Sequence, residues 1–241
     1  NGGTLYGTNG FGQYWDGNIT LGAHSTINAA NNFYIDGVIS GSSKNLTKTG
    51  TGTVILRGTN TYSGTTTVSA GTLNIGGSGS LGSGTYAGNI SNSGTFTYAS
   101  STAQTLSGVI SGSGALTKSG SSTLTLSGTN TYSGDTTISA GAITVSGLLG
   151  NGSYAGAIAN SGTLTLSSSS AQTLSGVISG SGGITKSGSG NVTLSGNNTF
   201  TGAVTLSSGT LIATANNSLG SSPSITSSSG TNFQISDGVT L

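Results

Sequence analysis

Short segments in which apolar and polar residues alternate recur along the chain. Each begins with a Gly or Ser and a small residue and continues as apolar-x-apolar, as in GTVIL (52–56), GTLNI (71–75) and GTLTL (162–166). The apolar side chains of one segment lie two positions apart, as Val54 and Leu56 do, which is the period of a half-buried β-strand. Helical spacing of apolar residues is absent from the sequence. The pattern therefore predicts an all-β protein built from short strands.

The segments return at regular intervals. They start at positions 52, 71, 94, 122, 141, 162, 190, 209 and 231, so that a short, a medium and a long step follow one another in turn. A longer unit of about 70 residues is superimposed on them. It is visible where SGVISGSGALTK (107–118) returns as SGVISGSGGITK (175–186). We interpret each unit as three coils of unequal length, averaging about 23 residues.

This repetition bears on the choice between two all-β folds. A sandwich could use similar strands, but self-similar coils favour a parallel β-solenoid, whose coils stack about 4.8 Å apart. Roughly eleven coils, of triangular cross-section, would make a rod of about 50 Å.

We expect the chain to form one continuous solenoid in four parts. Residues 1–36 hold an N-terminal irregular or capping turn and the first coils, and residues 37–107 form repeat unit 1. Residues 108–175 form repeat unit 2, and residues 176–241 an incomplete repeat unit 3. The segment Tyr14-Trp15-Asp16 breaks the repeat, so we expect it to lie in the irregular turn, with a recognition loop as the alternative.

The composition excludes several classes of protein. Only 4% of the 241 residues are charged, 45 are Gly, and Gly, Ser, Thr and Asn make up roughly three-fifths of the chain. Without Cys and with one His, the chain offers no disulfide or zinc site. A net charge of +1 gives no basic patch for nucleic acid, and no apolar run is long enough to span a membrane as a helix. We therefore expect no cofactor, no metal, no nucleic-acid partner and no membrane insertion by this segment.

The four acidic residues give little support for catalysis. Hydrolysis of a glycosidic bond needs two carboxylates close together. Asp135 stands where the other units have Thr65 and Ala203, and Asp36 and Asp237 each precede Gly-Val, as turn residues do. We therefore expect no catalytic residue and do not expect an enzyme.

Three lysines and several aromatic residues recur at equivalent positions of the repeat. Lys48, Lys118 and Lys186 would lie three coils, or about 14 Å, apart in one row. Such a row is either a surface-contact row for an acidic polysaccharide or, as we favour, a device that keeps a sheet edge soluble. The aromatic series would be a sugar-stacking stripe if exposed, whereas packing inside the corners is favoured because Phe replaces Tyr in one copy. The residues that we take as the structural signature of the repeat are Tyr62, Tyr132, Phe200, Tyr86, Tyr154, Leu56, Leu126 and Leu194.

Three long segments share a Gly-Thr-Asn-Thr-Tyr-Ser-Gly centre or a close variant of it. They are GTGTVILRGTNTYSGTTTVSAGTL (50–73), SGSSTLTLSGTNTYSGDTTISAGAI (119–143) and SGSGNVTLSGNNTFTGAVTLSSGTL (187–211). These segments resemble the autotransporter-associated β-strand repeat of type V secreted bacterial proteins. The resemblance implies a right-handed parallel β-helix that is exported across the outer membrane and acts as a stalk or adhesive surface. The usual signal peptide and translocator domain are not in the sequence, so we expect a fragment, a processed product or a relative with another export route.

Three hypotheses for the function follow. The first is a non-catalytic extracellular structural or adhesive β-helix, a passenger segment at the bacterial surface whose partners are host or cell-surface glycans or proteins. The second is a self-assembling subunit of an extracellular fibre or biofilm matrix, because both ends of the sequence fall within the repeat and uncapped coils offer open edges. The third and weakest is a β-helix that binds or degrades polysaccharide.

Overall fold

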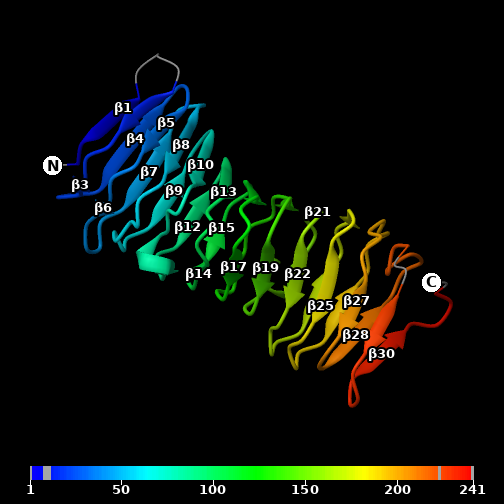
Figure 1. Cartoon of the computed structure of the whole chain (residues 1–241). Helices are drawn as coiled ribbons and strands as arrows, with labels where there is room; N and C mark the ends of the chain where they lie inside the picture. The colour runs from blue at the N-terminus through cyan, green and yellow to red at the C-terminus, as the bar shows by residue number, and fades with distance from the viewer. Residues whose placement is uncertain (1, 8–11, 222–223, 240–241) are drawn as a thin grey trace.

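The chain winds into a rod of stacked coils with the N-terminus at one end and the C-terminus at the other (Figure 1). The computed structural model describes residues 2–7, 12–221 and 224–239. Strands of neighbouring coils pair in parallel, as β1 does with β4 and β28 with β30. The predicted all-β parallel solenoid of about 11 turns is confirmed.

The strands of the described residues form five sheets. The six-stranded sheet contains β1 (Thr4–Gly7), β4 (Ser25–Ala29), β7 (Leu46–Thr49), β9 (Thr66–Val68), β12 (Ile90–Asn92) and β15 (Ile110–Ser111). The nine-stranded sheet contains β2 (Gln13–Trp15), β5 (Phe33–Ile35), β8 (Thr53–Leu56), β10 (Thr72–Ile75), β13 (Thr95–Tyr98), β16 (Ala115–Lys118), β18 (Thr136–Ile138), β21 (Ile158–Asn160) and β24 (Ile178–Ser179).

The remaining strands lie in an eight-, a five- and a two-stranded sheet. The eight-stranded sheet contains β11 (Thr85–Tyr86), β14 (Gln104–Leu106), β17 (Thr123–Leu126), β19 (Ala142–Val145), β22 (Thr163–Leu166), β25 (Gly183–Lys186), β27 (Val204–Leu206) and β29 (Ile225–Ser227). The five-stranded sheet contains β20 (Ser153–Tyr154), β23 (Gln172–Leu174), β26 (Val192–Leu194), β28 (Thr210–Ala213) and β30 (Asn232–Ile235), and the two-stranded sheet β3 (Ile19–Thr20) and β6 (Ile39–Ser40). Two short 3-10 turns are η1 (Gly82–Gly84) and η2 (Gly150–Gly152).

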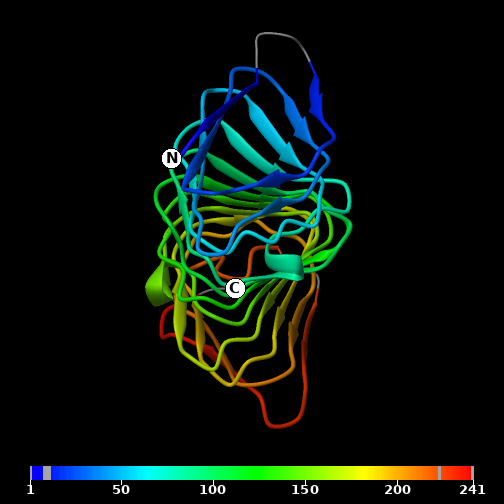
Figure 2. The same cartoon turned by 90° about the vertical axis from the view of Figure 1, so that its left-hand side faces the viewer.

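Each coil passes through three faces, so that the strands wrap around a common interior in the view along the rod (Figure 2). Pairing between successive coils joins Val54 to Leu73 and Thr66 to Ile90, and one coil takes up about 21 residues. The sequence unit of about 70 residues is therefore longer than three coils by about one face. The interpretation of each unit as three coils of unequal length is wrong for this reason.

The strands themselves show how the repeat advances. The first three apolar segments of the sequence are β8, β10 and β13 of the nine-stranded sheet. The next three are β17, β19 and β22 of the eight-stranded sheet, and the last three are β26, β28 and β30 of the five-stranded sheet. Each long step, such as the one from Thr95 to Thr123, is one coil plus one further face. Equivalent positions of successive repeats therefore lie on different faces of the rod.

A continuous apolar core fills the interior. Residues Val54 and Leu56 of β8 point inward with Leu73 and Ile75 of β10, and all four are buried. The outward positions between them carry small or polar residues along most of the rod. Because each coil covers the apolar side chains of the next, the stack is stabilised as a whole.

Glycines at the corners allow the coils to approach one another. A methyl group added to Gly128 would lie 2.4 Å from the carbonyl oxygen of Gly108 in the previous coil. Such a distance is below any normal contact, so this corner has no room for a larger residue. The high Gly content thus follows from coil stacking.

Residues 13–15 depart from the sequence prediction. The structure places Gln13–Trp15 in strand β2, paired in parallel with β5, so the expectation of an irregular turn at Tyr14-Trp15 is wrong. Its side chains nevertheless differ from the repeat, since Tyr14 and Trp15 are exposed.

Candidate functional site

The three lysines are buried, and they do not form a row. Lys48 pairs between Ile27 and Val68, Lys118 between Tyr98 and Ile138, and Lys186 between Leu166 and Leu206. They belong to three different sheets, and each has 0% of its surface exposed. The expectation of a surface-contact row of Lys48, Lys118 and Lys186 is wrong, as is the favoured role at an exposed edge. Alternation explains why, because Lys48 lies two positions after the buried Leu46 and shares its inward direction.

Each buried ammonium group binds backbone carbonyls at a corner. The Nζ of Lys48 donates to the carbonyl oxygens of Thr49 at 2.8 Å and Gly50 at 2.7 Å in its own coil and of Ala70 at 3.1 Å in the next. Lys186 repeats the arrangement with Gly188 and, at 3.0 Å, Ser208. Burial lowers the pKa of Lys48 to about 8. Lys48 and Lys186 therefore join consecutive coils from the inside, and Lys118 donates to the carbonyl of Gly120 in its own coil.

A buried hydroxyl cluster occupies the corner at the first tyrosine of the repeat. The Oγ1 of Thr66 lies 2.8 Å from the hydroxyl of Tyr62 and 2.7 Å from that of Tyr86, which also donates to the carbonyl of Gly64. The two rings meet edge to face at 5.7 Å. Burial raises the pKa of Tyr62 well above its ordinary value and that of Tyr86 to about 12.

The second repeat builds the same cluster on another part of the rod. Thr136 Oγ1 lies 2.8 Å from the hydroxyls of both Tyr132 and Tyr154, whose rings meet edge to face at 5.4 Å. In the third repeat, the positions of Tyr132 and Thr136 are taken by Phe200 and Val204, both fully buried. These five aromatic side chains therefore pack inside the corners and form no sugar-stacking stripe.

The leucines of the signature also lie in the core. Leu56, Leu126 and Leu194 end strands β8, β17 and β26 on three different sheets and are fully buried. They occupy the inward positions that the alternating pattern gives them.

A buried asparagine that the sequence analysis did not single out bridges the coils at each repeat. The Oδ1 of Asn130 accepts from the amide of Ile110 at 2.9 Å, and its Nδ2 donates to the carbonyls of Gly128 at 2.9 Å and Leu148 at 3.1 Å. Asn60 and Asn198 bind neighbouring coils in the same way. A signal for it is present in the sequence, because Asn stands two positions before the aromatic in all three copies.

Asp16 and Asp36 directly follow the paired Trp15 and Ile35 on neighbouring coils, whereas Asp135 lies further along the rod. Asp36 forms an ion pair with Arg57 at 3.4 Å, and Asp135 accepts from the amide of Ala157 at 2.9 Å. Within residues 2–7, 12–221 and 224–239, no three His, Cys, Asp or Glu side chains come together as metal ligands would.

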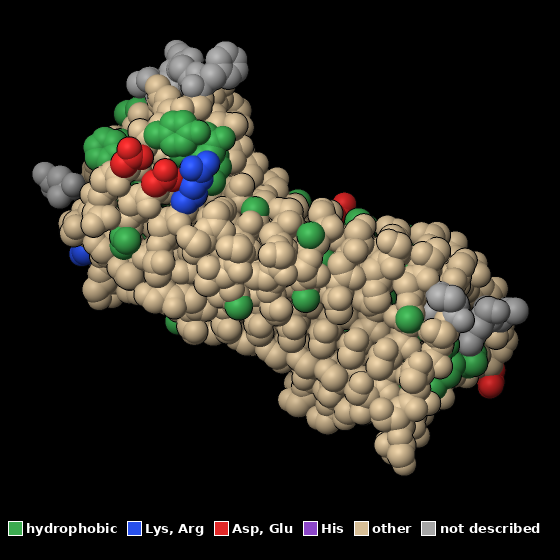
Figure 3. All heavy atoms as spheres, viewed as in Figure 1, with side chains coloured by type: hydrophobic (Ala, Val, Ile, Leu, Met, Phe, Trp, Pro, Cys, Tyr) green, Lys and Arg blue, Asp and Glu red, His purple; other side chains and the backbone are tan. Residues whose placement is uncertain are grey.

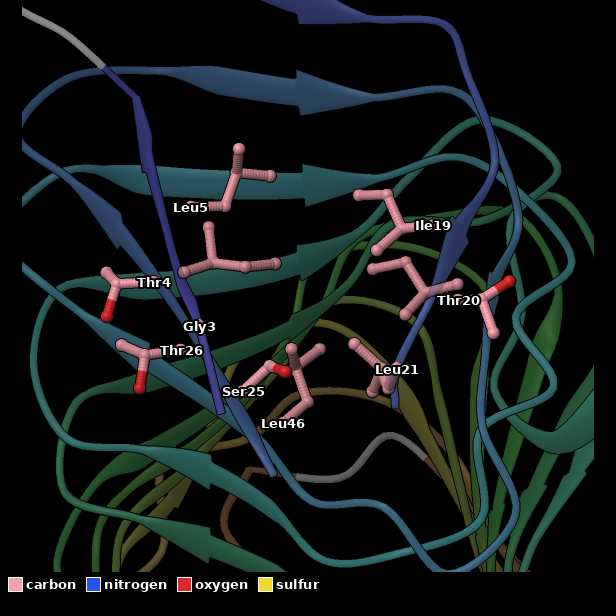
Figure 4. Close-up of a pocket in the computed structure, with 11 residues that line it drawn as sticks. Gly3, Thr4, Leu5, Ile19, Thr20, Leu21, Ser25, Thr26 and Leu46 are labelled. Atoms are coloured by element: carbon pink, nitrogen blue, oxygen red, sulfur yellow. The ribbon is translucent and has the colours of Figure 1, made fainter. Parts of the chain in front are cut away.

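The N-terminal coils enclose a cavity of about 250 Å3. Leu5 and Ile19 point into it, together with Leu21 and Leu46, while the hydroxyls of Thr4 and Thr26 turn away (Figure 4). The lining is mainly aliphatic, so the cavity is an opening onto the core.

The comparisons with known proteins identify the repeat. The family model of the passenger-associated-transport-repeat matches residues 46–75, 116–145 and 184–213. The chain contains passenger-associated-transport repeats. This result confirms the resemblance to autotransporter passenger repeats, and each matched segment contains one buried lysine, one bridging asparagine and one corner aromatic. Neither the curated proteins nor the solved structures give a match.

The passenger-associated-transport repeat is typical of exported, surface-associated proteins. Among the described residues, no helix has the length and apolar character needed to cross a membrane.

Proposed function

We propose that the chain is a non-catalytic extracellular β-helix that acts as a stalk or adhesive passenger segment of an autotransporter-like surface protein. The observation that carries this proposal is the direction of the repeated side chains. Lys48, Asn60 and Tyr62 and their equivalents point inward and bind backbone or one another. The repeat therefore uses its reactive groups to join coils, and its outer surface is mostly small and uncharged.

Export and surface location belong to the same proposal. The passenger repeats and the absence of Cys support secretion as an unfolded chain that folds outside the cell. Its partners would be glycans or proteins of cell surfaces, or further copies of itself. The charge of +1 on 241 residues gives nucleic acid no basic surface, and the chain would not insert into the membrane.

Surface display tests this proposal. The chain would be fused to an autotransporter translocator domain in a Gram-negative host, with the translocator alone as the control. We expect external protease to remove the chain from intact cells, and we expect displaying cells to adhere to other cells or to surfaces more than the control does. Retention of the chain inside the cell, or adhesion equal to the control, would overturn the adhesive passenger role. Release of reducing ends from polysaccharides would contradict the non-catalytic part.

A second candidate, a fibre subunit that stacks head to tail, is favoured by the end surfaces. The cavity at the N-terminal coils is aliphatic, and Ile225 and Ile235 of the last strands are 40% and 47% exposed. A coil of another copy could cover these side chains. Electron microscopy of the purified chain at high concentration tests this, since fibres that disappear in Ile19→Asp but persist in Val177→Asp support it. Monodisperse short rods contradict it.

A further inference from the structure

The face of the rod seen in Figure 3 carries a concentrated group of aromatic and charged side chains over the described N-terminal coils. In the space-filling view, acidic, basic and hydrophobic side chains gather over the N-terminal coils, while most of the visible rod is neither charged nor hydrophobic (Figure 3). The group consists of Tyr14, Tyr34, Asp16, Asp36 and Arg57, here called the aromatic patch. It supplies three of the nine charged residues of the chain.

Strand register arranges the patch in two rows. Tyr14 pairs with Tyr34 and Tyr34 with Ile55, on the outward side of the nine-stranded sheet. The second row lies two positions further along each strand and contains Asp16, Asp36 and Arg57. In the following coils the first row holds only Asn74, Thr97, Thr117, Thr137, Ala159 and Ser179.

The side chains of the patch hold one another in place. The rings of Tyr14 and Tyr34 are stacked, with centroids 4.6 Å apart and planes within 9°. The guanidinium of Arg57 lies 4.4 Å from the Tyr34 centroid and 5.6 Å from that of Tyr14, and its Nη1 lies 3.4 Å from Asp36. Tyr14 is nevertheless 59% exposed. A preordered surface of this kind loses little side-chain freedom when it binds a partner.

The chemistry of the patch fits one class of ligand. A flat exposed ring offers an apolar surface, and the phenol, carboxylate and guanidinium groups at its border offer hydrogen bonds. A pyranose has the complementary form, with C–H groups on its faces and hydroxyls around its rim. The two carboxylates outnumber the single guanidinium, which Asp36 already engages, so an acidic polymer would be repelled. The small uncharged residues along the adjoining row leave an open track for further sugar units.

We propose that the aromatic patch is a binding site for a neutral polysaccharide. This inference rests on the proposed adhesive function and names the ligand class for it. Trp15 pairs with Ile35 in the row that faces inward in later coils, and although it is 43% exposed it lies on the other side of the strand from Tyr14, so it is not assigned to the site. Tyr14 and Tyr34 would stack on sugar rings, and Asp16 and Asp36 would accept hydrogen bonds from sugar hydroxyls.

Affinity measurements on the purified chain test the site. The probes are mannan and a neutral β-glucan, with alginate as the acidic comparison. We expect binding of at least one neutral polymer, and we expect Tyr14→Ser/Tyr34→Ser to weaken it by about tenfold or more. Tyr6→Ser is the matched control, because Tyr6 is 64% exposed on a different sheet and should be replaced without loss of affinity. Thermal unfolding of both variants should stay close to that of the wild type.

Several outcomes would overturn the inference. They are failure to bind either neutral polymer, binding of alginate alone, equal affinity of the double variant, or a dimer of the wild type that the double variant loses. A fall in the unfolding temperature of the double variant alone would assign the patch to capping of the first coils. If displayed cells still adhere while the purified chain binds no neutral polymer, the proposed function survives and the polysaccharide site does not.

Discussion

The hydroxyl of Thr66 lies 2.8 Å from the phenol oxygen of Tyr62, and both side chains are sealed from solvent. The same threonine also contacts the hydroxyl of Tyr86. In the third repeat a valine and a phenylalanine stand at the positions of Thr66 and Tyr62, so the corner can be built from either polar or apolar partners. The corner therefore requires that the two side chains are both polar, so that their hydroxyls bind each other, or both apolar.

Substitution of the bridging threonine tests this matching. Thr66→Val should destabilise the chain by about 1–3 kcal/mol, because buried phenol hydroxyls lose a partner while the shape of the side chain is kept. The measurement is the free energy of unfolding in urea. The triple variant Tyr62→Phe/Thr66→Val/Tyr86→Phe has the Phe and Val of the third repeat at the first two positions and removes the third hydroxyl, so it should be more stable than Thr66→Val alone. Equal stability of Thr66→Val and wild type would contradict the assigned role of the hydroxyl cluster.

The buried lysines make the free energy of unfolding depend on pH in the alkaline range. The pKa of Lys48 is about 8 in the folded chain and 10.5 in the unfolded one, so between these values the unfolded chain binds more protons. The free energy of unfolding should therefore rise with pH, by up to about 1.4 kcal/mol per pH unit for this lysine. Urea unfolding between pH 8 and 9 measures the slope where unfolded tyrosines are still almost fully protonated, since their ordinary pKa is 10.0.

The matched variants for this prediction are Lys48→Met and Leu56→Met. Lys48→Met removes one titrating group and should reduce the slope, while burial of Lys118 and Lys186 also lowers their pKa and keeps the remainder. Leu56→Met changes a buried residue of the next strand without adding or removing a charge, so its slope should equal that of the wild type. A wild-type stability that is constant or falls from pH 8 to 9 would show that the ammonium groups remain charged at the higher pH.

The bridging asparagine should be sensitive to a change of one atom. In Asn130→Asp the oxygen that accepts from Ile110 is kept, but the group that donates to Gly128 and Leu148 becomes a carboxylate oxygen facing two carbonyls. We expect a loss of at least about 2 kcal/mol at neutral pH, smaller in acid where the carboxyl is protonated. The exposed Asn191→Asp is the control and should change the stability little. Similar unfolding midpoints for the two variants would argue against the bridge.

Substitution of two glycines by alanine distinguishes the effect of close packing between coils from the effect of backbone flexibility in the unfolded chain. Gly128→Ala should strongly destabilise the rod, since its new methyl would meet the carbonyl oxygen of Gly108 at 2.4 Å. Gly183→Ala places its methyl 3.5 Å from the nearest atom, at a position where the previous repeat has Ala115. That variant should be neutral or stabilised by up to about 1 kcal/mol. Thermal unfolding compares the two, and a stable Gly128→Ala would refute the tight corner.

The alternating pattern was sufficient to predict the strands and the inward leucines. Val54 and Leu56 are buried as their spacing indicates, and the repeated segments are the strands of a parallel solenoid. The residues that pair between successive coils were not predictable in the same way. Which residue lies above Leu116 depends on corner lengths, and pairing places Phe96 and Thr136 beside it, neither of them its equivalent in another repeat.

The position of the lysines was within reach of the sequence. Lys118 follows Leu116 by two positions, so alternation alone directs it inward. The general preference of charged groups for the surface suggested the opposite. It fails here because corner carbonyls accept the ammonium protons while the aliphatic part of the side chain packs in the core. The aromatic patch was not predicted, because Tyr14 and Tyr34 lie before the first clear repeat and no equivalent position drew attention to them.

Because each repeat begins one face further around the rod, its three copies point in three directions. A receptor that recognises the outer surface of one repeat would find the next copy a third of a turn away. Among these three copies a flat target could therefore engage only one at a time, and the same face would be presented again only after three repeats. Separate receptors that surround the rod would instead each meet the same surface, whichever side they approach from.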